Sequence, residues 1–436
     1  MKKKWKKEYK SRRDFIKKSA IGGLFIAGGW PLLASIESNV PIKRTSSLQF
    51  SDVDYSSINW ARIREKFPVT GEHTYFNTGS LGPSPQMVID KICNKTEFFE
   101  RLGTDGHSKK YITRNKYAQF FNVQPEEITF TRNATEGMNI AARSLPLKKG
   151  DEILLTNHEH IGGAAPWLAL QKDIGVTLRL VELDMSGENN LQLLKDSIGP
   201  KTKVISFSHV TSTTGMLLPA KEIAELCKEN NIFCCIDGAQ SAGLIPVDLN
   251  DINPDIYACS GHKWLYGPSG TGILFINKTV IEKCSPNHVG AYTDKKYDLD
   301  SLTLEYLMTA SRQEYGTRNS PLIYGLESAL DFIHEIGFEH IVQRRKELAN
   351  YFLSAIDNFK DIKVISPQNV DYCTPMISLQ IVGIDSSKST PNLYLDQKIR
   401  VRGIYENNLN AFRISFSIFN TKSEIDYLVD SLLALK

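Results

Sequence analysis

Short apolar runs alternate with helical segments between about residues 120 and 276. Several runs are apolar at nearly every position, as in Ile232-Phe233-Cys234-Cys235-Ile236, which is typical of strands covered on both faces of a sheet. Between two runs, Pro219–Asn230 has the apolar spacing of a crossover helix, with Pro219 suited to its first turn. The pattern predicts an α/β domain with a mostly parallel seven-stranded sheet. Its strands are Ile128–Thr131, Glu152–Asn157, Thr177–Leu183, Val204–His209, Ile232–Asp237, Ile256–Ser260 and Thr271–Ile276.

The pattern changes after Pro321 and predicts a second, smaller α+β domain. Two long amphipathic helices are expected at about 321–336 and 338–356, and the stretch Trp60–Tyr75 is expected to pack on this domain. The predicted division is therefore 77–319 for the large domain, and 51–76 with 320–436 for the small one. The remaining elements of the small domain are the β-rich segments Met376–Val382, Arg400–Ile404 and Phe412–Phe416 and a final helix from Lys422.

The N-terminus has the order basic, apolar, small that is typical of an export signal. Ser11-Arg12-Arg13-Asp14-Phe15-Ile16-Lys17 precedes a glycine-rich apolar stretch, Ile21–Trp30, which is too short for a comfortable membrane span. The residues resemble the twin-arginine signal S-R-R-x-F-[LI]-K, which implies export of the folded protein to the periplasm by the twin-arginine machinery. The alternative is a basic cytosolic tail before a buried helix.

Residues 1–34 are the predicted signal peptide, and the polar residues 35–50 are the predicted linker. Cleavage is expected after Ala34. Leu32-Leu33-Ala34 lacks a small residue at its first position, however, so an uncleaved membrane anchor is the alternative.

Length and charge narrow the class of protein. A chain of 436 residues suits two domains, and 41% hydrophobic with 23% charged residues is typical of a globular protein. The net charge of +3 depends on the first 20 residues, which alone carry about +8 and leave about −5 for the rest. We therefore expect no nucleic-acid partner.

A carboxylate and an amine follow two of the buried strands. Asp237 ends one strand, and Lys263 comes directly after another in Ser260-Gly261-His262-Lys263. Because the carboxyl ends of parallel strands share one edge of a sheet, both groups are expected to face one site. Chemistry with pyridoxal 5'-phosphate (PLP) needs this pair, a lysine for the aldehyde and a carboxylate to keep the pyridine nitrogen protonated. A surface lysine and a helix-capping aspartate are the structural alternatives.

The motifs D-G-A-Q at Asp237–Gln240 and S-G-H-K-x-x-x-G-P-x-G at Ser260–Gly270 resemble the class V aminotransferase family. These fold-type I PLP-dependent enzymes include cysteine desulfurases and isopenicillin N epimerase-like proteins, and the resemblance covers about residues 73–435. It implies that PLP is the cofactor and that Lys263 holds it as a Schiff base and moves protons. It also implies that Asp237 pairs with the pyridinium nitrogen, that Gln240 contacts the ring hydroxyl, and that Ser260 and His262 bind the phosphate.

The resemblance assigns further cofactor-binding residues. Asn133–Gly137 stands between a strand and a helix, where backbone N–H groups can cradle an anion, and matches the family's phosphate loop at Ala134 and Thr135. His160 matches the aromatic residue that stacks on the PLP ring, and is placed with Lys263 and Asp237 among the catalytic residues. Ser212 is also placed in the cofactor site. Thr317 lies in a segment like the family's G-T-x-N, which reaches the phosphate of the partner subunit and implies a homodimer with shared active sites.

No metal is expected in this site. His158 and His160 have a spacing of two residues, but no third ligand follows at useful spacing.

Two arginines are candidates for binding an amino-acid substrate. Arg413 matches the family arginine that binds the substrate α-carboxylate, and Arg402 matches a nearby helper. A guanidinium fork suits a carboxylate because it donates two parallel hydrogen bonds. Asn77 is placed in the same substrate site. An exposed strand arginine is the alternative, most of all for Arg402.

Two departures from the cysteine desulfurases guide the predicted reaction. Asn407 stands five residues past Arg402, where those enzymes carry a nucleophilic cysteine, and Ser212 stands where they usually have asparagine. The sequence therefore favours an aminotransferase or epimerase-like enzyme acting on an amino acid. The alternatives are a PLP-dependent β-lyase on cysteine-like substrates that forms no enzyme persulfide, and a non-catalytic ligand-binding protein on the same scaffold.

Overall fold

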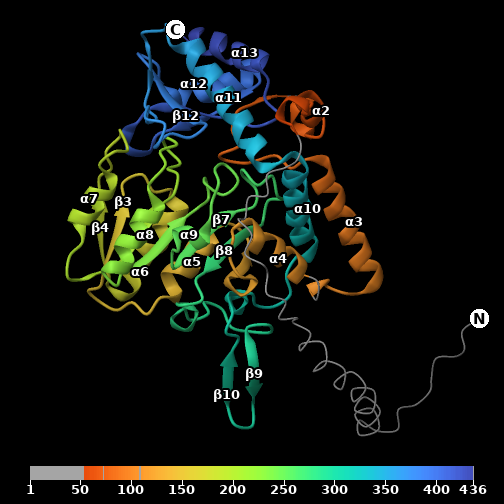
Figure 1. Ribbon diagram of the computed structural model, residues 1–436, viewed down its shortest axis with the longest axis vertical. Helices are drawn as coiled ribbons and strands as arrows, with labels where there is room; N and C mark the ends of the chain where they lie inside the picture. Colours follow the sequence, from red (N-terminus) through yellow and green to blue (C-terminus); the bar gives the residue numbers. More distant parts are fainter. Residues whose placement is uncertain (1–53, 72, 108–109, 436) are drawn as a thin grey trace, which may run out of the picture. The chain divides into compact units, whose positions relative to one another are not determined.

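The predicted alternation of strands and helices is present in the computed structural model, which describes residues 54–71, 73–107 and 110–435 (Figure 1). Seven strands form one sheet in the order β2-β8-β7-β6-β5-β3-β4. Strands β3 to β7 are parallel, whereas β8 runs antiparallel to both of its neighbours. The prediction of a mostly parallel seven-stranded α/β sheet is confirmed. The strands are β2 Ile128–Thr131, β3 Glu152–Thr156, β4 Thr177–Val181, β5 Thr202–Ser208, β6 Phe233–Asp237, β7 Ile256–Ser260 and β8 Gly272–Ile276.

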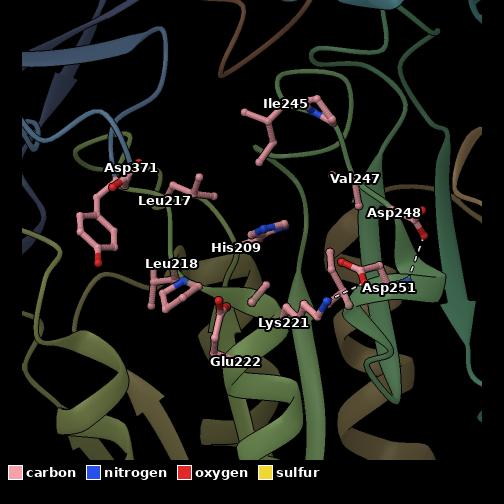
Figure 2. A pocket seen from close by; sticks show the side chains of 15 residues that line it. His209, Leu217, Leu218, Lys221, Glu222, Ile245, Val247, Asp248, Asp251 and Asp371 are labelled. Atoms are coloured by element: carbon pink, nitrogen blue, oxygen red, sulfur yellow. Dashed lines mark hydrogen bonds and ion pairs between the residues drawn. The ribbon is translucent and has the colours of Figure 1, made fainter. Parts of the chain in front are cut away.

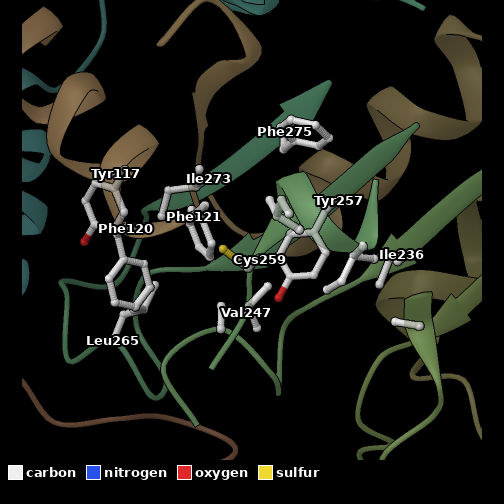
Figure 3. Close-up of a cluster of buried hydrophobic side chains, with 14 of the residues drawn as sticks. Tyr117, Phe120, Phe121, Ile236, Val247, Tyr257, Cys259, Leu265, Ile273 and Phe275 are labelled. Carbon is white, nitrogen blue, oxygen red and sulfur yellow. The ribbon is translucent and has the colours of Figure 1, made fainter. Parts of the chain in front are cut away.

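The sheet is buried on both faces except at its edge strand β4, as the apolar strands predicted. In β7, Tyr257 and Cys259 pack into one hydrophobic cluster, and Ile256 and Ala258 pack into another. Figure 3 shows the first cluster, where Tyr257 lies near Phe121 with ring centroids 6.0 Å apart. Alternate side chains of a strand point to opposite faces, so a strand covered on both faces must be apolar throughout.

Helices connect the strands and cover the sheet. The helix predicted at Pro219–Asn230 is α8, Ala220–Glu229, and Pro219 is its N-cap and not part of its first turn. Six strand ends also differ from the prediction, four of them by one residue and two by two residues. Strand β4 ends at Val181 because the N–H of Leu183 donates to Asn157 Oδ1, and β5 begins earlier, at Thr202. The other helices up to the sheet's last strand are α2 Trp60–Arg64, α3 Gln86–Leu102, α4 Lys110–Phe120, α5 Ala134–Ser144, α6 Ile161–Ile174, α7 Asn190–Ser197 and α9 Leu249–Ile252.

The C-terminal part contains a four-stranded antiparallel sheet in the order β11-β12-β15-β14. Helices α10 and α11 precede it where they were predicted, while β11 and α12 were not predicted. The strand expected at Arg400–Ile404 is split, because β13 pairs with β1 and only β14 joins the sheet. The elements are α10 Ser320–Ile336, α11 Phe338–Ile356, β11 Ile362–Val364, β12 Met376–Ile381, α12 Ser386–Gln397, β13 Ile399–Arg400, β14 Arg402–Ile404, β15 Ala411–Ser415 and α13 Lys422–Leu433.

The segment Trp60–Tyr75 packs on this C-terminal part, as expected. Strand β1, Thr74–Tyr75, runs parallel to β13, and Arg64 forms an ion pair with Glu424 at 2.8 Å. In α10, Leu326 shares a hydrophobic cluster with Tyr257 of the large sheet. The division into two domains stays a prediction.

Two further features concern the rest of the chain. An unpredicted hairpin of β9, Asp294–Asp298, and β10, Thr303–Tyr306, projects from the described fold (Figure 1). None of the helices within the described ranges is long and apolar enough to cross a membrane. The predicted twin-arginine signal and linker lie outside the described residues.

Candidate active site

Lys263 lies in the turn after β7, against a segment far away in sequence. The N–H of Gly82 donates to the carbonyl oxygen of His262 at 2.7 Å. A Cβ at Gly82 would lie 1.8 Å from the carbonyl oxygen of Lys263, so only glycine permits this approach. The turn that presents the amine is therefore held from both sides, by its own strand and by the segment before α3.

The Lys263 amine and the Asp237 carboxylate lie close enough for the charge of each to shift the pKa of the other. Burial lowers the pKa of Lys263 to about 8, and the charge of Asp237 opposes this shift. Burial raises the pKa of Asp237, and the charge of Lys263 opposes that shift in turn. Asp237 is fixed by a bond from the N–H of Ala239 to its Oδ1 at 2.9 Å. A lysine with a lowered pKa is a better nucleophile and base near neutral pH.

Ala134 and Ser260, two of the predicted phosphate-binding residues, meet at the start of α5. The N–H of Ala134 donates to Ser260 Oγ at 3.1 Å, which joins the end of β7 to the helix. Thr135 is exposed in the first turn, and a Cβ at Gly162 would lie 2.4 Å from its hydroxyl oxygen. The neighbouring His262 is half-buried, and burial lowers its pKa.

His160 caps helix α6 next to the same group. Its Nδ1 accepts a bond from the N–H of Gly162 at 3.0 Å. Burial lowers its pKa to about 4, and the charges of Lys263, Arg402 and Arg413 add to this shift. The ring is therefore neutral near pH 7, with its proton on Nε2, and is held in one orientation.

Gln240 has its amide engaged within the protein. Its Nε2 donates to the carbonyl oxygen of Gly79 at 2.7 Å, and its Oε1 accepts from the indole N–H of Trp264 at 2.8 Å. One amide hydrogen remains for the contact with the ring hydroxyl that the resemblance implies. That contact stays a prediction.

Arg413 is fully buried in β15, which excludes the exposed strand arginine left open by the sequence. Its Nη1 donates to the carbonyl oxygen of Ser212 at 2.7 Å and its Nη2 to Ser80 Oγ at 2.9 Å. Burial and the charge of Arg402 lower the pKa of Arg413 to about 9, against the opposing effects of Glu406 and Tyr75. No salt bridge neutralises Arg413 among the described side chains, and its Nε has no hydrogen-bond partner.

Arg402 lies opposite Arg413 in the β14–β15 register. It is half-buried and pairs with Glu406, a residue that the sequence interpretation missed. The acidic residue lies only four positions further on, but the sequence alone did not show that the intervening loop turns back on Arg402.

Three other predicted site residues, Asn77, Ser212 and Thr317, differ in whether they contact the elements that carry Lys263 and Arg413. Asn77 is buried and forms a β-bridge with Ser415 of β15. Its Oδ1 has no hydrogen-bond partner within the described part of the chain. Ser212 is buried and contributes its carbonyl oxygen to Arg413. Thr317 is exposed in the loop before α10, and no hydrogen bond joins it to these residues in the described structure. Its predicted role at the partner subunit stays a prediction.

Glu159 was also missed, although it stands beside His160. It accepts from Thr156 Oγ1 at 2.5 Å and from Ser208 Oγ at 2.7 Å, which ties the end of β3 to the end of β5. Burial raises its pKa to about 7, with a contribution from Asp237. Its position three residues after the end of β3, at the same edge of the sheet as Asp237, was the available signal.

These residues fit PLP. Lys263 supplies the amine for the aldehyde, Asp237 the carboxylate for the pyridine nitrogen, and His160 a fixed neutral ring. Glycines keep this region free of side chains, since a Cβ at Gly163 would lie 2.9 Å from Asp237 Oδ2. Within the described residues, no group of three His, Cys, Asp or Glu side chains is placed to hold a metal ion.

Comparison with known proteins identifies the family of the chain. The model of the aminotransferase class-V family matches residues 96–428, and the chain belongs to this family. A cysteine desulfurase of Escherichia coli O7:K1 is 28% identical over 405 residues, covering 85% of this chain and 97% of the relative.

Two solved structures of the protein C-DES are also similar. One, with glycine covalently linked to the PLP cofactor, has a TM-score of 0.79 and 26% identity over 86% of this chain and 99% of its own. The other is the cystine C-S lyase with its reaction product cysteine persulfide, with a TM-score of 0.78 and 27% identity over 85% of this chain and 99% of its own. The fold is that of fold-type I, and the chain is a PLP-dependent enzyme, not the non-catalytic binding protein that the sequence left open.

Proposed function

We propose that the enzyme is a PLP-dependent C–S β-lyase that acts on cysteine-type amino acids and forms no persulfide on its own chain. The observation that carries this proposal is the buried, unneutralised Arg413 beside Lys263, next to a loop with no cysteine. The similarity to a cystine C-S lyase supports it. The aminotransferase or epimerase reaction favoured by the sequence becomes the second candidate.

Arg413 would bind the α-carboxylate of the substrate. A buried guanidinium whose Nη atoms are already fixed by Ser212 and Ser80 has little conformational freedom to lose on binding. The incoming carboxylate would also satisfy its free Nε. This holds Cα of the substrate toward Lys263.

When bound, PLP supplies a ring that accepts electrons from Cα. Lys263, displaced by the substrate amine, would take the Cα proton, and its pKa of about 8 places it close to the working pH of a general base. The Cβ–S bond then breaks, and the sulfur leaves with the electron pair and takes a proton. Hydrolysis of the remaining fragment by water gives pyruvate and ammonia.

The loop after β14 explains why no persulfide should form on the enzyme. Asn407 occupies the position of the desulfurase cysteine, and its Nδ2 donates to the carbonyl oxygen of Asn157 at 2.7 Å. Five of the seven cysteines are buried, and the remaining two, Cys93 and Cys373, lie outside Glu406–Asn410. The sulfur would therefore leave on the small product.

The test is to incubate the holoenzyme with L-cystine and L-cysteine and to measure pyruvate, ammonia and sulfur products, with the Lys263→Ala variant as control. We expect pyruvate and ammonia in equal amounts, cysteine persulfide from cystine or sulfide from cysteine, and no persulfide on the protein by mass spectrometry. Persulfide on the chain would contradict the proposal.

The second candidate rests on Ser212, which stands where desulfurases usually have asparagine. Incubation of an amino-acid panel in D₂O separates the outcomes. Formation of the corresponding keto acid without C–S cleavage indicates transamination, and deuterium at Cα with inversion indicates epimerisation. Either result in place of pyruvate would favour the second candidate.

A further inference from the structure

A cavity lies outside the active-site group, where β5 ends and α8 begins (Figure 2). Its volume is about 470 Å³, within the range of small-molecule sites. Its walls combine apolar side chains with several charges, and they include neither Lys263, His160 nor Arg413. The apolar part is formed by Leu217, Leu218, Ile245 and Val247.

The imidazole of His209 is a polar group in this cavity that the fold does not satisfy. It is only 5% exposed, and its Nδ1 has no hydrogen-bond partner among the residues that the structure describes. Its ring contacts the ring of Tyr257 edge-on, with centroids 6.4 Å apart. Figure 2 shows the imidazole among the lining side chains. Buried polar groups are nearly always paired, so an imidazole with an unpaired nitrogen in the wall of a cavity is a candidate partner for a ligand hydroxyl.

Burial lowers the pKa of His209 to about 4, so the ring is neutral near pH 7. A neutral imidazole accepts at one nitrogen and donates at the other. It therefore matches a hydroxyl group better than an anion.

The charged side chains around the cavity have a negative excess. Lys221 is paired with Asp251 at 2.7 Å. The carboxylate of Asp248 already accepts hydrogen bonds within the protein, because it caps α9 and accepts from Asn122 Nδ2 at 2.9 Å. Two lining carboxylates, Glu222 and Asp371, then have no ion-pair partner within the described structure. Both are exposed, so they favour a cation without a large desolvation penalty.

We propose that this cavity binds a small organic cation with an apolar body and a hydroxyl group. The hydroxyl bonds to His209, the body packs on the apolar walls, and the ammonium faces Glu222 and Asp371. The site is separate from the amino-acid site, and the proposal does not depend on the reaction that the enzyme catalyses.

The test uses N,N-dimethyltyramine as the probe, because a tertiary amine cannot form a Schiff base with PLP. Its binding to the holoenzyme is measured by titration calorimetry beside two matched molecules, N,N-dimethylphenethylamine without the hydroxyl and 4-ethylphenol without the cation. Loss of the hydroxyl should weaken binding about threefold to tenfold, the scale of one neutral hydrogen bond. Loss of the cation should weaken it about twofold to fivefold.

Variants locate the bound probe. His209→Phe should abolish the preference for the hydroxyl, and Glu222→Gln should weaken only the two cationic molecules. Glu225→Gln, the same charge change at an exposed position of α8 outside the cavity, should leave all three unchanged. If His209→Phe does not fold, the proposal is still tested by two measurements. These are the preference of the unaltered protein for the hydroxyl-bearing probe and the affinities of the Glu222→Gln variant for the three molecules. No binding at millimolar probe, or binding indifferent to hydroxyl, charge and Glu222, overturns the proposal.

Discussion

At the scale of single residues, the assignment of Lys263 can be tested by chemical trapping. Borohydride reduction of the holoenzyme should fix PLP to Lys263 and remove the visible absorption of the Schiff base. Lys263→Ala should show no covalent cofactor, because no other lysine lies beside Asp237 in the described group. Peptide mass spectrometry locates the cofactor, and Lys278→Ala, at an exposed lysine after β8, is the control. Covalent cofactor in Lys263→Ala would refute the assignment.

The lowered pKa of Lys263 predicts how cofactor attachment depends on pH. Only the uncharged amine attacks the aldehyde, so the rate of PLP attachment to the cofactor-free protein should rise with pH and level off above about 8. If Lys263 had its ordinary pKa of 10.5, the rate of PLP attachment would keep rising well above pH 8. Stopped-flow absorbance measures the rate.

The same shift has a consequence for stability. Between about pH 8 and pH 10.5 the unfolded chain binds more protons at Lys263 than the folded chain does. The contribution of this group to the free energy of unfolding of the cofactor-free protein therefore increases with pH in that window. A rate of PLP attachment that still increases at pH 10 would contradict the lowered pKa of Lys263, on which both expectations depend.

Arg413 should govern the affinity for the substrate. In Arg413→Lys the charge is kept and the guanidinium fork is lost, so we expect KM to rise about 30-fold or more, roughly 2 kcal/mol, with a smaller change in kcat. Arg400→Lys, at an exposed position of the neighbouring β13, is the matched control. Because Arg413 also holds Ser212 and Ser80, circular dichroism melting must show that the variant is folded. An unchanged KM in a folded variant would exclude the assigned role.

At the scale of elements, the first turn of α6 limits the space around the cofactor. A Cβ in Gly163→Ala would push on Asp237 Oδ2, the end of a side chain that can move. Alanine is favoured over glycine in a helix by about 1 kcal/mol, so the fold should persist while Asp237 shifts. We expect PLP affinity to fall about tenfold and the cofactor absorption to change.

The control for this change is Gly199→Ala, where the nearest atom is 3.7 Å from the added Cβ. Spectroscopic titration of the cofactor-free proteins with PLP compares the two. Equal PLP affinities of the Gly163→Ala and Gly199→Ala variants would show that Asp237 can accommodate the added methyl group without affecting the cofactor.

The central strands of the large sheet could be predicted because both of their faces are apolar. Asp237 and Lys263 could be predicted because one ends such a strand and the other lies in the turn after one. The break between β13 and β14 could not, because Val401 continues the apolar pattern and only the pairing with β1 divides it. Helix α12 was missed because its first turns, from Ser386, are polar and contain Pro391. The approach of Gly82 to Lys263 joins segments 181 positions apart, which no local pattern shows.

At the scale of the whole molecule, the active-site group is drawn from distant parts of the chain. Asn77 and Ser80 come from the segment before α3, Lys263 from the large sheet and Arg413 from the C-terminal sheet. The chain must therefore fold over most of its length before the group exists. A protein that binds PLP in the cytoplasm would need an export route that accepts folded proteins, which agrees with the twin-arginine resemblance.

Export is the last prediction. Arg12 and Arg13 carry the resemblance to the twin-arginine signal, so changing both to lysine should abolish transport to the periplasm while the charge of the N-terminus is kept. The measurement is fractionation of a bacterial host that has the pathway, with PLP-dependent absorption as evidence that the retained protein is folded. Changing Lys6 and Lys7 to arginine, which leaves every residue of the motif intact, is the control and should permit transport. Full periplasmic protein from the Arg12→Lys, Arg13→Lys variant would show that the chain leaves the cytoplasm by another route, and an unfolded precursor would then be expected to bind PLP only after transport.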